Sequence, residues 1–116
     1  MKTHLKFVAA IALLIGAGTA LKAQTLKDAI QLTENEQYVA AKAAFKKLIA
    51  AEPTNGDNFF YFGDLLLKMD DVDSANIIFQ KGVDIEPTNP LTHVGKARGL
   101  MYIGKITEGQ SELSQA

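Results

Sequence analysis

The sequence predicts an all-α protein made of stacked helix–turn–helix units, and three observations support this fold class. The tetrapeptide Glu-Pro-Thr-Asn occurs at residues 52–55 and again at 86–89, and the 34-residue distance between the copies equals the length of one unit in a stacked helical array. Apolar residues recur at three- and four-residue spacing, whereas no segment alternates with the two-residue period of a strand over a useful length. Short turns separate the apolar stretches and favour antiparallel neighbours.

Residues 1–23 have the three-part layout of a secretory signal. Lys2 and Lys6 give a positive start, residues 7–16 form an apolar run, and Ala23 is a small residue at a suitable cleavage point. The uncharged stretch 7–21 has 15 residues, short of the roughly 20 that cross a bilayer. We therefore expect a signal helix that meets the membrane only transiently and is cleaved, so that the protein is periplasmic or secreted in a bacterium. A retained anchor and a buried soluble helix are the alternatives.

The first pair of helices is expected at residues 25–35 and 38–51. In the second of these, alanines and larger apolar residues between Ala41 and Ile49 fall on one face of a helix. Pro53 lies beyond its end and stops it, because proline has no amide hydrogen to continue the hydrogen-bond ladder.

The middle pair is expected at residues 57–69 and 73–85. Asn55 can cap the first helix of this pair with its side-chain oxygen. Asp70, Asp71 and Asp73 favour a turn followed by a helix start, since carboxylates suit the positive N-terminal end of a helix. Pro87 ends the second helix.

The last pair is expected at residues 90–103 and 106–116. Asn89 is a cap, and Pro90 occupies the first helical position, where its missing donor costs little. Gly104 ends the first helix of this pair.

The middle unit resembles a tetratricopeptide repeat. Large and small residues follow the spacing of that signature at Phe59, Phe62, Gly63, Leu66, Ala75, Phe79, Gly82 and Pro87. The small residues let neighbouring helices approach closely, and the large ones fill the space between them. The resemblance implies a right-handed α-solenoid of about two and a half repeats in a domain spanning residues 24–116, with repeats at about 22–55, 56–89 and 90–116, the last incomplete.

The two outer units depart from the signature. Thr25 and Asp28 stand where large apolar residues are usual, which is typical of an end unit whose outer helix meets water. The last unit has His93 and Lys96 at its large positions and lacks a closing proline. An unrelated bundle of helical hairpins is the alternative to a repeat array.

Side chains suited to catalysis or metal binding are few. The chain has no cysteine, which excludes disulfides, thiol catalysis and cysteine–zinc sites. His93 is the only histidine after the signal, and a lone helical histidine is far more often structural or solvated than a ligand or base. The aspartates at 70–73 lack the glycine and the distal glutamate of a calcium loop. We therefore predict no catalytic residue, no metal and no cofactor, and the chain is not expected to be an enzyme.

The charge balance argues against a nucleic-acid partner. Residues 1–23 hold three of the 12 basic residues and none of the 13 acidic ones, so the remaining chain has a net charge of −4. Such a chain has no electrostatic reason to hold nucleic acid. Lys42, Lys46 and Lys47 are interpreted as a solvated helix face.

The resemblance implies a binding surface, because the first helix of each pair lines the concave side of such arrays. The residues at these positions are Ile30, Phe60, Asp64, Leu67, Val94, Arg98 and Met101. An apolar groove with one acid and one base can hold a helix or an extended peptide. Alternatively, Phe60 and Leu67 simply pack against their neighbours.

The first functional hypothesis is therefore a non-enzymatic scaffold that binds a protein or peptide in the bacterial envelope. The second is self-association into a homo-oligomer through the last repeat, where Ile106 and Leu113 have no following helix to cover them. A third reading is that the chain is a piece of a longer array.

Overall fold

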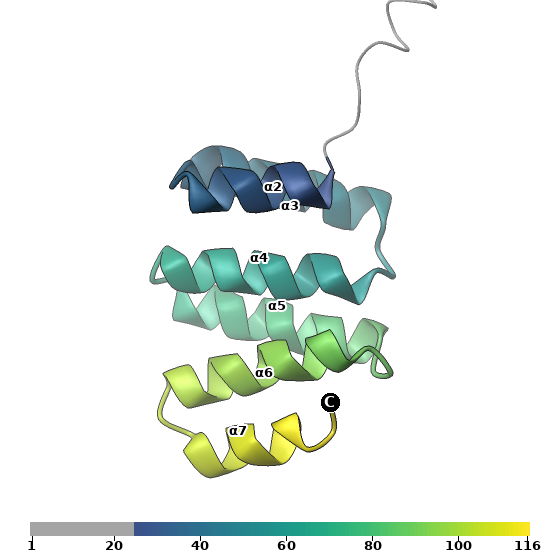
Figure 1. Cartoon of the computed structure of the whole chain (residues 1–116), viewed down its shortest axis with the longest axis vertical. Coiled ribbons are helices and arrows are strands. Elements are labelled where there is room, and N and C mark those ends of the chain that lie inside the picture. Colours follow the sequence, from purple (N-terminus) through teal and green to yellow (C-terminus); the bar gives the residue numbers. More distant parts are fainter. Residues whose placement is uncertain (1–24) are drawn as a thin grey trace, which may run out of the picture.

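The computed structural model describes residues 25–116, which form six helices in three tiers (Figure 1). The helices are α2 (Leu26–Glu34), α3 (Tyr38–Ala51), α4 (Gly56–Lys68), α5 (Val72–Ile85), α6 (Pro90–Tyr102) and α7 (Ile106–Leu113). Within these residues there is no strand, so the all-α prediction is confirmed, and each helix lies close to its expected position. The signal predicted at residues 1–23 lies outside the described residues.

Each tier is one antiparallel helix pair: α2 with α3, α4 with α5, and α6 with α7 (Figure 1). The first helices of the pairs follow one another along one side of the stack, and α3 and α5 lie behind them. The middle tier contacts both of the others, since α4 packs against α3 and α6. None of the helices in the described range has the length and apolar character that membrane crossing requires.

The hydrophobic core is concentrated in the middle tier. The Phe79 ring is 1% exposed and lies against Gly63, where an added Cβ would collide with it. Phe62 stacks on Phe45 of the first tier with ring centroids 5.6 Å apart. Gly63 and Ala75 therefore have the packing role that the sequence predicts, because they allow α4 and α5 to approach closely.

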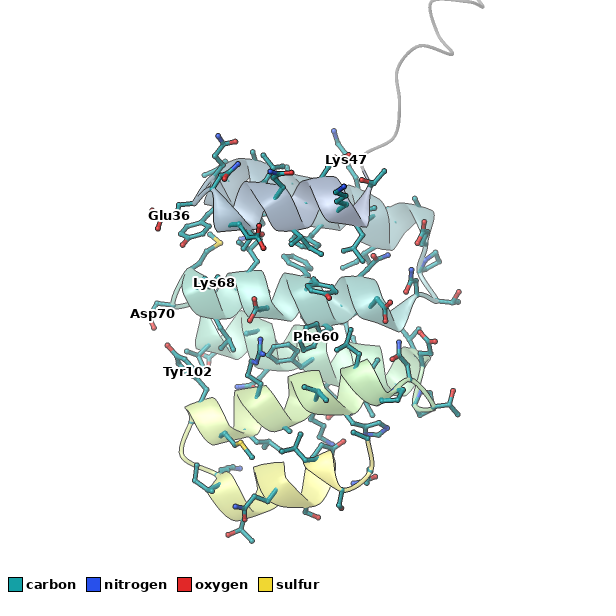
Figure 2. All side chains as sticks on the ribbon, in the orientation of Figure 1. Glu36, Lys47, Phe60, Lys68, Asp70 and Tyr102 are labelled. Atoms are coloured by element: carbon teal, nitrogen blue, oxygen red, sulfur yellow. The ribbon has the colours of Figure 1, made fainter. Side chains whose placement is uncertain are left out.

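The turn inside each pair uses one residue with a left-handed backbone. These residues are Glu36 (φ 59°), Asp70 (φ 60°) and Gly104 (φ 85°), and they are spaced by 34 residues. Figure 2 shows Glu36 and Asp70 at the same edge of the stack, one tier apart. The turn thus repeats with the sequence period, although only the last tier uses the residue that adopts this conformation at no steric cost.

The turns between tiers are joined by the second Glu-Pro-Thr-Asn copy. Glu86 Oε2 accepts a hydrogen bond from the backbone N–H of Gly56 (2.6 Å), which places a carboxylate at the N-terminus of α4. Asn89 Nδ2 donates to Asp57 Oδ1 (2.7 Å), while Asn89 Oδ1 accepts from the Leu91 N–H and caps α6 (3.0 Å). Asn55 caps α4 in the same way. Both predicted asparagine caps are confirmed.

Candidate binding surface on the first helices

The seven residues predicted for the binding surface divide into two groups. Phe60 and Leu67 are buried, each 8% exposed. Figure 2 shows Phe60 between α4 and α6, where its ring lies edge-on to Tyr61, with centroids 5.0 Å apart. These two side chains therefore pack within the stack. The other five line two hollows.

The α2–α4 hollow lies between the first and middle tiers and has a volume of about 110 Å³. It is lined by Ile30, Thr33, Glu34, Phe45, Tyr61, Asp64 and Lys68. Two of the predicted residues, Ile30 and Asp64, are among them. The hollow is too small for more than a single side chain of a partner, because ligand sites commonly measure about 300–1,000 Å³.

The α6–α7 hollow lies in the last tier and has a volume of about 450 Å³. It is lined by Val94, Ala97, Arg98, Met101, Tyr102 and Leu113. All three residues predicted on α6 are present, and Arg98 is the one charged group among them. Tyr102 and Leu113 are 54% and 41% exposed, so large apolar surface is open to solvent here.

The acid and the base predicted for the groove bind each other across the two tiers. Arg98 Nη1 donates to Asp64 Oδ1, and Lys68 Nζ lies 3.3 Å from Asp64 Oδ2. The Arg98 guanidinium also lies over the Phe60 ring, 5.2 Å from its centroid. Asp64 therefore contributes no free negative charge to the surface, whereas Arg98 has donors left over, because a guanidinium carries five N–H groups.

The lining of the α6–α7 hollow repeats a surface of the middle tier. Each of its residues lies 34 positions after one of Phe60, Gly63, Asp64, Leu67, Lys68 and Phe79. In the middle tier this surface is covered by α6: Gly95 lies against the Phe79 and Phe60 rings, and Arg98 binds Asp64. In the last tier no helix in the described residues covers the corresponding surface.

A buried polar pair connects α6 to α7 and was missed as a pair by the sequence reasoning. His93 and Glu112 are 6% and 7% exposed, and His93 Nδ1 lies 2.7 Å from Glu112 Oε1. The other ring nitrogen lies 2.5 Å from the Pro87 carbonyl oxygen. The hydrogen bond to Glu112 is the main cause that raises the pKa of His93, the bond to Pro87 is the next, and burial opposes both. Of the two roles expected for His93, structural or solvated, its burial fits the structural one.

A signal for this pair was present in the sequence. His93, Lys96 and Glu112 lie 34 positions after Phe59, Phe62 and Ile78, so three charged or polar residues replace three apolar ones. Lys96 Nζ lies 3.5 Å from Glu112 Oε2. Aligning the repeats position by position would therefore have brought the three together.

A third hollow of about 290 Å³ lies against the second helices. Its lining residues are Lys42, Lys46, Phe62, Leu66, Ser74, Ile77 and Ile78. Lys42 is half-buried and Lys46 exposed, so this α3–α5 hollow includes part of the basic face of α3. The sequence reasoning placed no site here.

No metal centre is formed by the side chains of residues 25–116. No three histidine or carboxylate side chains gather there in a way that could hold a metal ion. Asp71, one of the three clustered aspartates, accepts a hydrogen bond from the Ser74 N–H (3.3 Å) and caps α5.

Comparisons with known proteins agree with the observed architecture. Three solved structures share it: MamA MSR-1 C2, MamA AMB-1 P212121 and MamA AMB-1 C2221. Each matches 76% of this chain with a TM-score of 0.62 at 19% identity, a likeness that concerns the fold alone. The match covers 51% of the first and 52% of the other two, so this chain spans about half the length of those MamA chains.

The search of curated proteins finds no match. The tetratricopeptide repeat family model matches residues 32–98, which is more than half of the chain and includes the whole middle tier. Together with the all-helical tiers, this match supports a protein-interaction scaffold. The chain belongs to the tetratricopeptide repeat family.

Proposed function

We propose that this protein is a non-enzymatic scaffold that binds an α-helix of a partner protein in the α6–α7 hollow. One observation carries the proposal: the hollow is the repeat equivalent of the surface that α6 covers in the middle tier. A surface that accepts a helix at one repeat is suited to accept a helix at the next. Helix-in-groove binding is also a common mode of peptide recognition.

The covered surface indicates what the partner helix must look like. α6 places Gly95 against the Phe79 ring, where an added Cβ would lie 2.7 Å from it. Gly99, four residues later, lies against the Asn76 side chain and the Phe79 ring, and an added Cβ would collide with Asn76 and lie 3.0 Å from the ring. In the last tier Leu113 stands in place of Phe79, and a smaller apolar side chain leaves more room. The partner helix should therefore carry two small residues, such as alanines, four positions apart and facing Leu113.

Charge adds a second requirement to the partner. In the middle tier Asp64 receives Arg98, which lies three residues after Gly95 on the covering helix. In the last tier Arg98 itself occupies the position of Asp64 and is 46% exposed at its side chain. A carboxylate three residues after the first small residue of the partner would pair with it. Such a half-exposed pair contributes about 0.2–1 kcal/mol and selects register more than affinity.

A labelled helical peptide with this pattern tests the proposal by fluorescence anisotropy. Leu113→Glu places a charge in the hollow at an exposed position and should weaken binding by about tenfold or more, or about 1.4 kcal/mol. The matched control is Ile77→Glu, because Ile77 is 59% exposed and lines the α3–α5 hollow. Equal binding by the wild type and both variants would exclude the α6–α7 hollow as the site.

Self-association is the second candidate, and exposed apolar side chains of the last tier favour it. Tyr102, Ile103, Ile106 and Leu113 are each between 41% and 54% exposed. Stacking of one copy onto the next from end to end is disfavoured, since α2 carries Lys27 and Gln31 at the repeat positions of Gly95 and Gly99. Self-association would instead pair two last tiers. Light scattering over a concentration series tests this, and a monomer throughout would exclude it.

We further propose that the scaffold acts after export, in the periplasm or the medium of a bacterium. The support is the secretory-signal layout of residues 1–23. Fractionation of cells that express the full chain, with mass spectrometry of the N-terminus, tests both the location and the cleavage. An intact N-terminus on protein in the cytoplasm would contradict the proposal.

A further inference from the structure

We infer that His93 and Glu112 form a proton-dependent latch that holds α7 against α6. Because α7 supplies Leu113 to the α6–α7 hollow, the latch would also regulate that hollow. The holding of α7 by this pair is independent of any ligand, whereas regulation of the hollow rests on the proposed function.

Hydrogen-bond accounting shows why the latch needs a proton. The Pro87 carbonyl can only accept, so His93 Nε2 must carry a hydrogen for their 2.5 Å contact. A neutral imidazole has one N–H, so Nδ1 would then be bare and would face Glu112 Oε1 at 2.7 Å. The contact is favourable only when a proton lies between the ring and the carboxylate. Loss of that proton leaves the lone pair of His93 Nδ1 facing the negative Glu112 carboxylate. The two repel each other, and because both are buried, water cannot solvate them.

The charged groups around the ring support the same protonation state. Glu112 on α7 favours the imidazolium, and Lys96 on α6 opposes it more weakly while its Nζ also approaches Glu112. In the connection between α5 and α6, Glu86 directs its carboxylate at Gly56 and Asn89. Asp57 on α4 likewise binds Asn89. Glu112 is therefore the carboxylate that pairs with His93.

The helix α7 depends on this contact more than α3 or α5 depends on any one side chain. Its only buried residues are Gly109, which has no side chain, and Glu112. It has eight residues, against 14 in each of α3 and α5. The one buried side chain that fixes α7 is thus an ionisable group paired with a histidine.

The direction of the pH effect follows from the linkage rule. The pKa of His93 is raised in the folded protein, so the latch contributes fully below the ordinary histidine value of 6.5. Its contribution is lost as the pH rises through the raised pKa of His93. Alkaline conditions should therefore loosen α7, and Leu113 should leave its place in the hollow.

Hydrogen exchange of the α7 amides in the full chain tests the latch. Dividing each measured rate by the intrinsic exchange rate at the same pH gives the extent to which α7 opens. From about pH 6 to about pH 9, opening of α7 should increase by about tenfold, which is the size of effect expected when one buried polar group loses its hydrogen-bond partner. The matched variant His93→Phe/Glu112→Ile installs the residues found at the equivalent positions of the middle tier. Its α7 should open to the same extent at both pH values. Opening in the wild type that does not change with pH, or an equal change in this variant, would overturn the inference.

A second measurement does not depend on the double variant folding. The ring resonances of His93, which has only His4 as a companion, should titrate at a lower pH in Glu112→Gln than in the wild type. Identical titrations would overturn the latch.

Helical-peptide affinity measured at the same two pH values separates the latch from the proposed function. If α7 opens with pH and the peptide binds more weakly at high pH, both stand. If α7 opens with pH but the peptide binds at neither value, the latch stands and the proposed function fails. If the peptide binds equally at both values while α7 opens, regulation of the hollow is refuted.

Discussion

The middle and last tiers share one backbone plan but differ in what fills it. Both have a left-handed turn residue at the same repeat position and small residues where the two helices meet. In the middle tier Phe62 and Phe79 fill the interior with aromatic rings, whereas Lys96 and Leu113 take their places in the last tier.

The repeat period therefore sets the geometry and leaves the interior free to vary. Turn conformation and helix spacing depend on a few small or strained positions, which recur in both tiers. Burial of large rings sets stability, and this is concentrated in the middle tier. The last tier can therefore have an open hollow and a buried charged pair without loss of the fold.

The largest loss of stability is expected when a ring of the middle tier is truncated, and the equivalent residue of the last tier provides the comparison. Phe79→Ala should lower the free energy of unfolding by about 3–5 kcal/mol, because it leaves a cavity at a ring that is 1% exposed. Leu113→Ala, at the equivalent position, should cost about 1 kcal/mol or less, since Leu113 is already 41% exposed. Urea titrations of both variants measure this, and equal losses would contradict the comparison.

The next largest loss of stability is expected at Gly63, which allows α4 and α5 to approach closely. Gly63→Ala should destabilise by about 1–3 kcal/mol, because the new methyl group would collide with the Phe79 ring. The equivalent positions in the other tiers already hold Ala29 and Ala97, both buried. Thermal unfolding tests the effect, and a variant as stable as the wild type would show that Phe79 is free to move aside. In Phe79→Leu, the same glycine substitution should cost less.

A smaller loss of stability is expected at the glutamate of the second Glu-Pro-Thr-Asn copy than at Phe79 or Gly63, and the first copy should lose less still. Glu86→Ala should cost about 1 kcal/mol, since it removes a carboxylate from the N-terminus of α4 and a hydrogen bond to Gly56. Glu52→Ala is the comparison, because Glu52 is exposed and its carboxylate accepts from Asn55 in its own turn (2.9 Å) and, at 3.5 Å, from Asn58 of the same tier junction, and neither of these bonds reaches the other turn between tiers. Should Glu52→Ala cost as much as Glu86→Ala, the bond between tiers would not be the stabilising element.

The smallest effect is expected at the charged bridge between tiers. Asp64→Ala should change the free energy of unfolding by about 1 kcal/mol or less, because its partners Arg98 and Lys68 are about half exposed. Chemical denaturation at low and high salt measures this. A loss above about 2 kcal/mol that persists in high salt would mean that the bridge is a structural element.

Much of the fold could be predicted from the sequence. Helical periodicity located every helix in residues 25–116, and asparagine and proline chemistry located the starts of α4 and α6. These features depend on neighbours within a few residues. The small residues could also be predicted, because close helix packing imposes them at a fixed spacing.

The candidate site was less predictable, because it depends on contacts between distant residues. The resemblance to a tetratricopeptide repeat placed Asp64 and Arg98 on the same side of the stack but did not show that they bind each other. Phe60 and Leu67 lie on the expected helix, yet how far a neighbouring tier covers them is decided by tertiary packing. His93 and Glu112 are 19 residues apart on different helices, so no local pattern joins them.

In our proposal, a stable middle tier supports a last tier whose hollow accepts a helix. Amide hydrogen exchange resolved by helix, with and without the helical peptide at about pH 6, tests it most directly. We expect α4 and α5 to be the best protected, α7 to open most readily without peptide, and added peptide to protect α6 and α7 selectively. Uniform protection of all tiers that the peptide leaves unchanged, or peptide protection confined to α2 and α3, would contradict the claim.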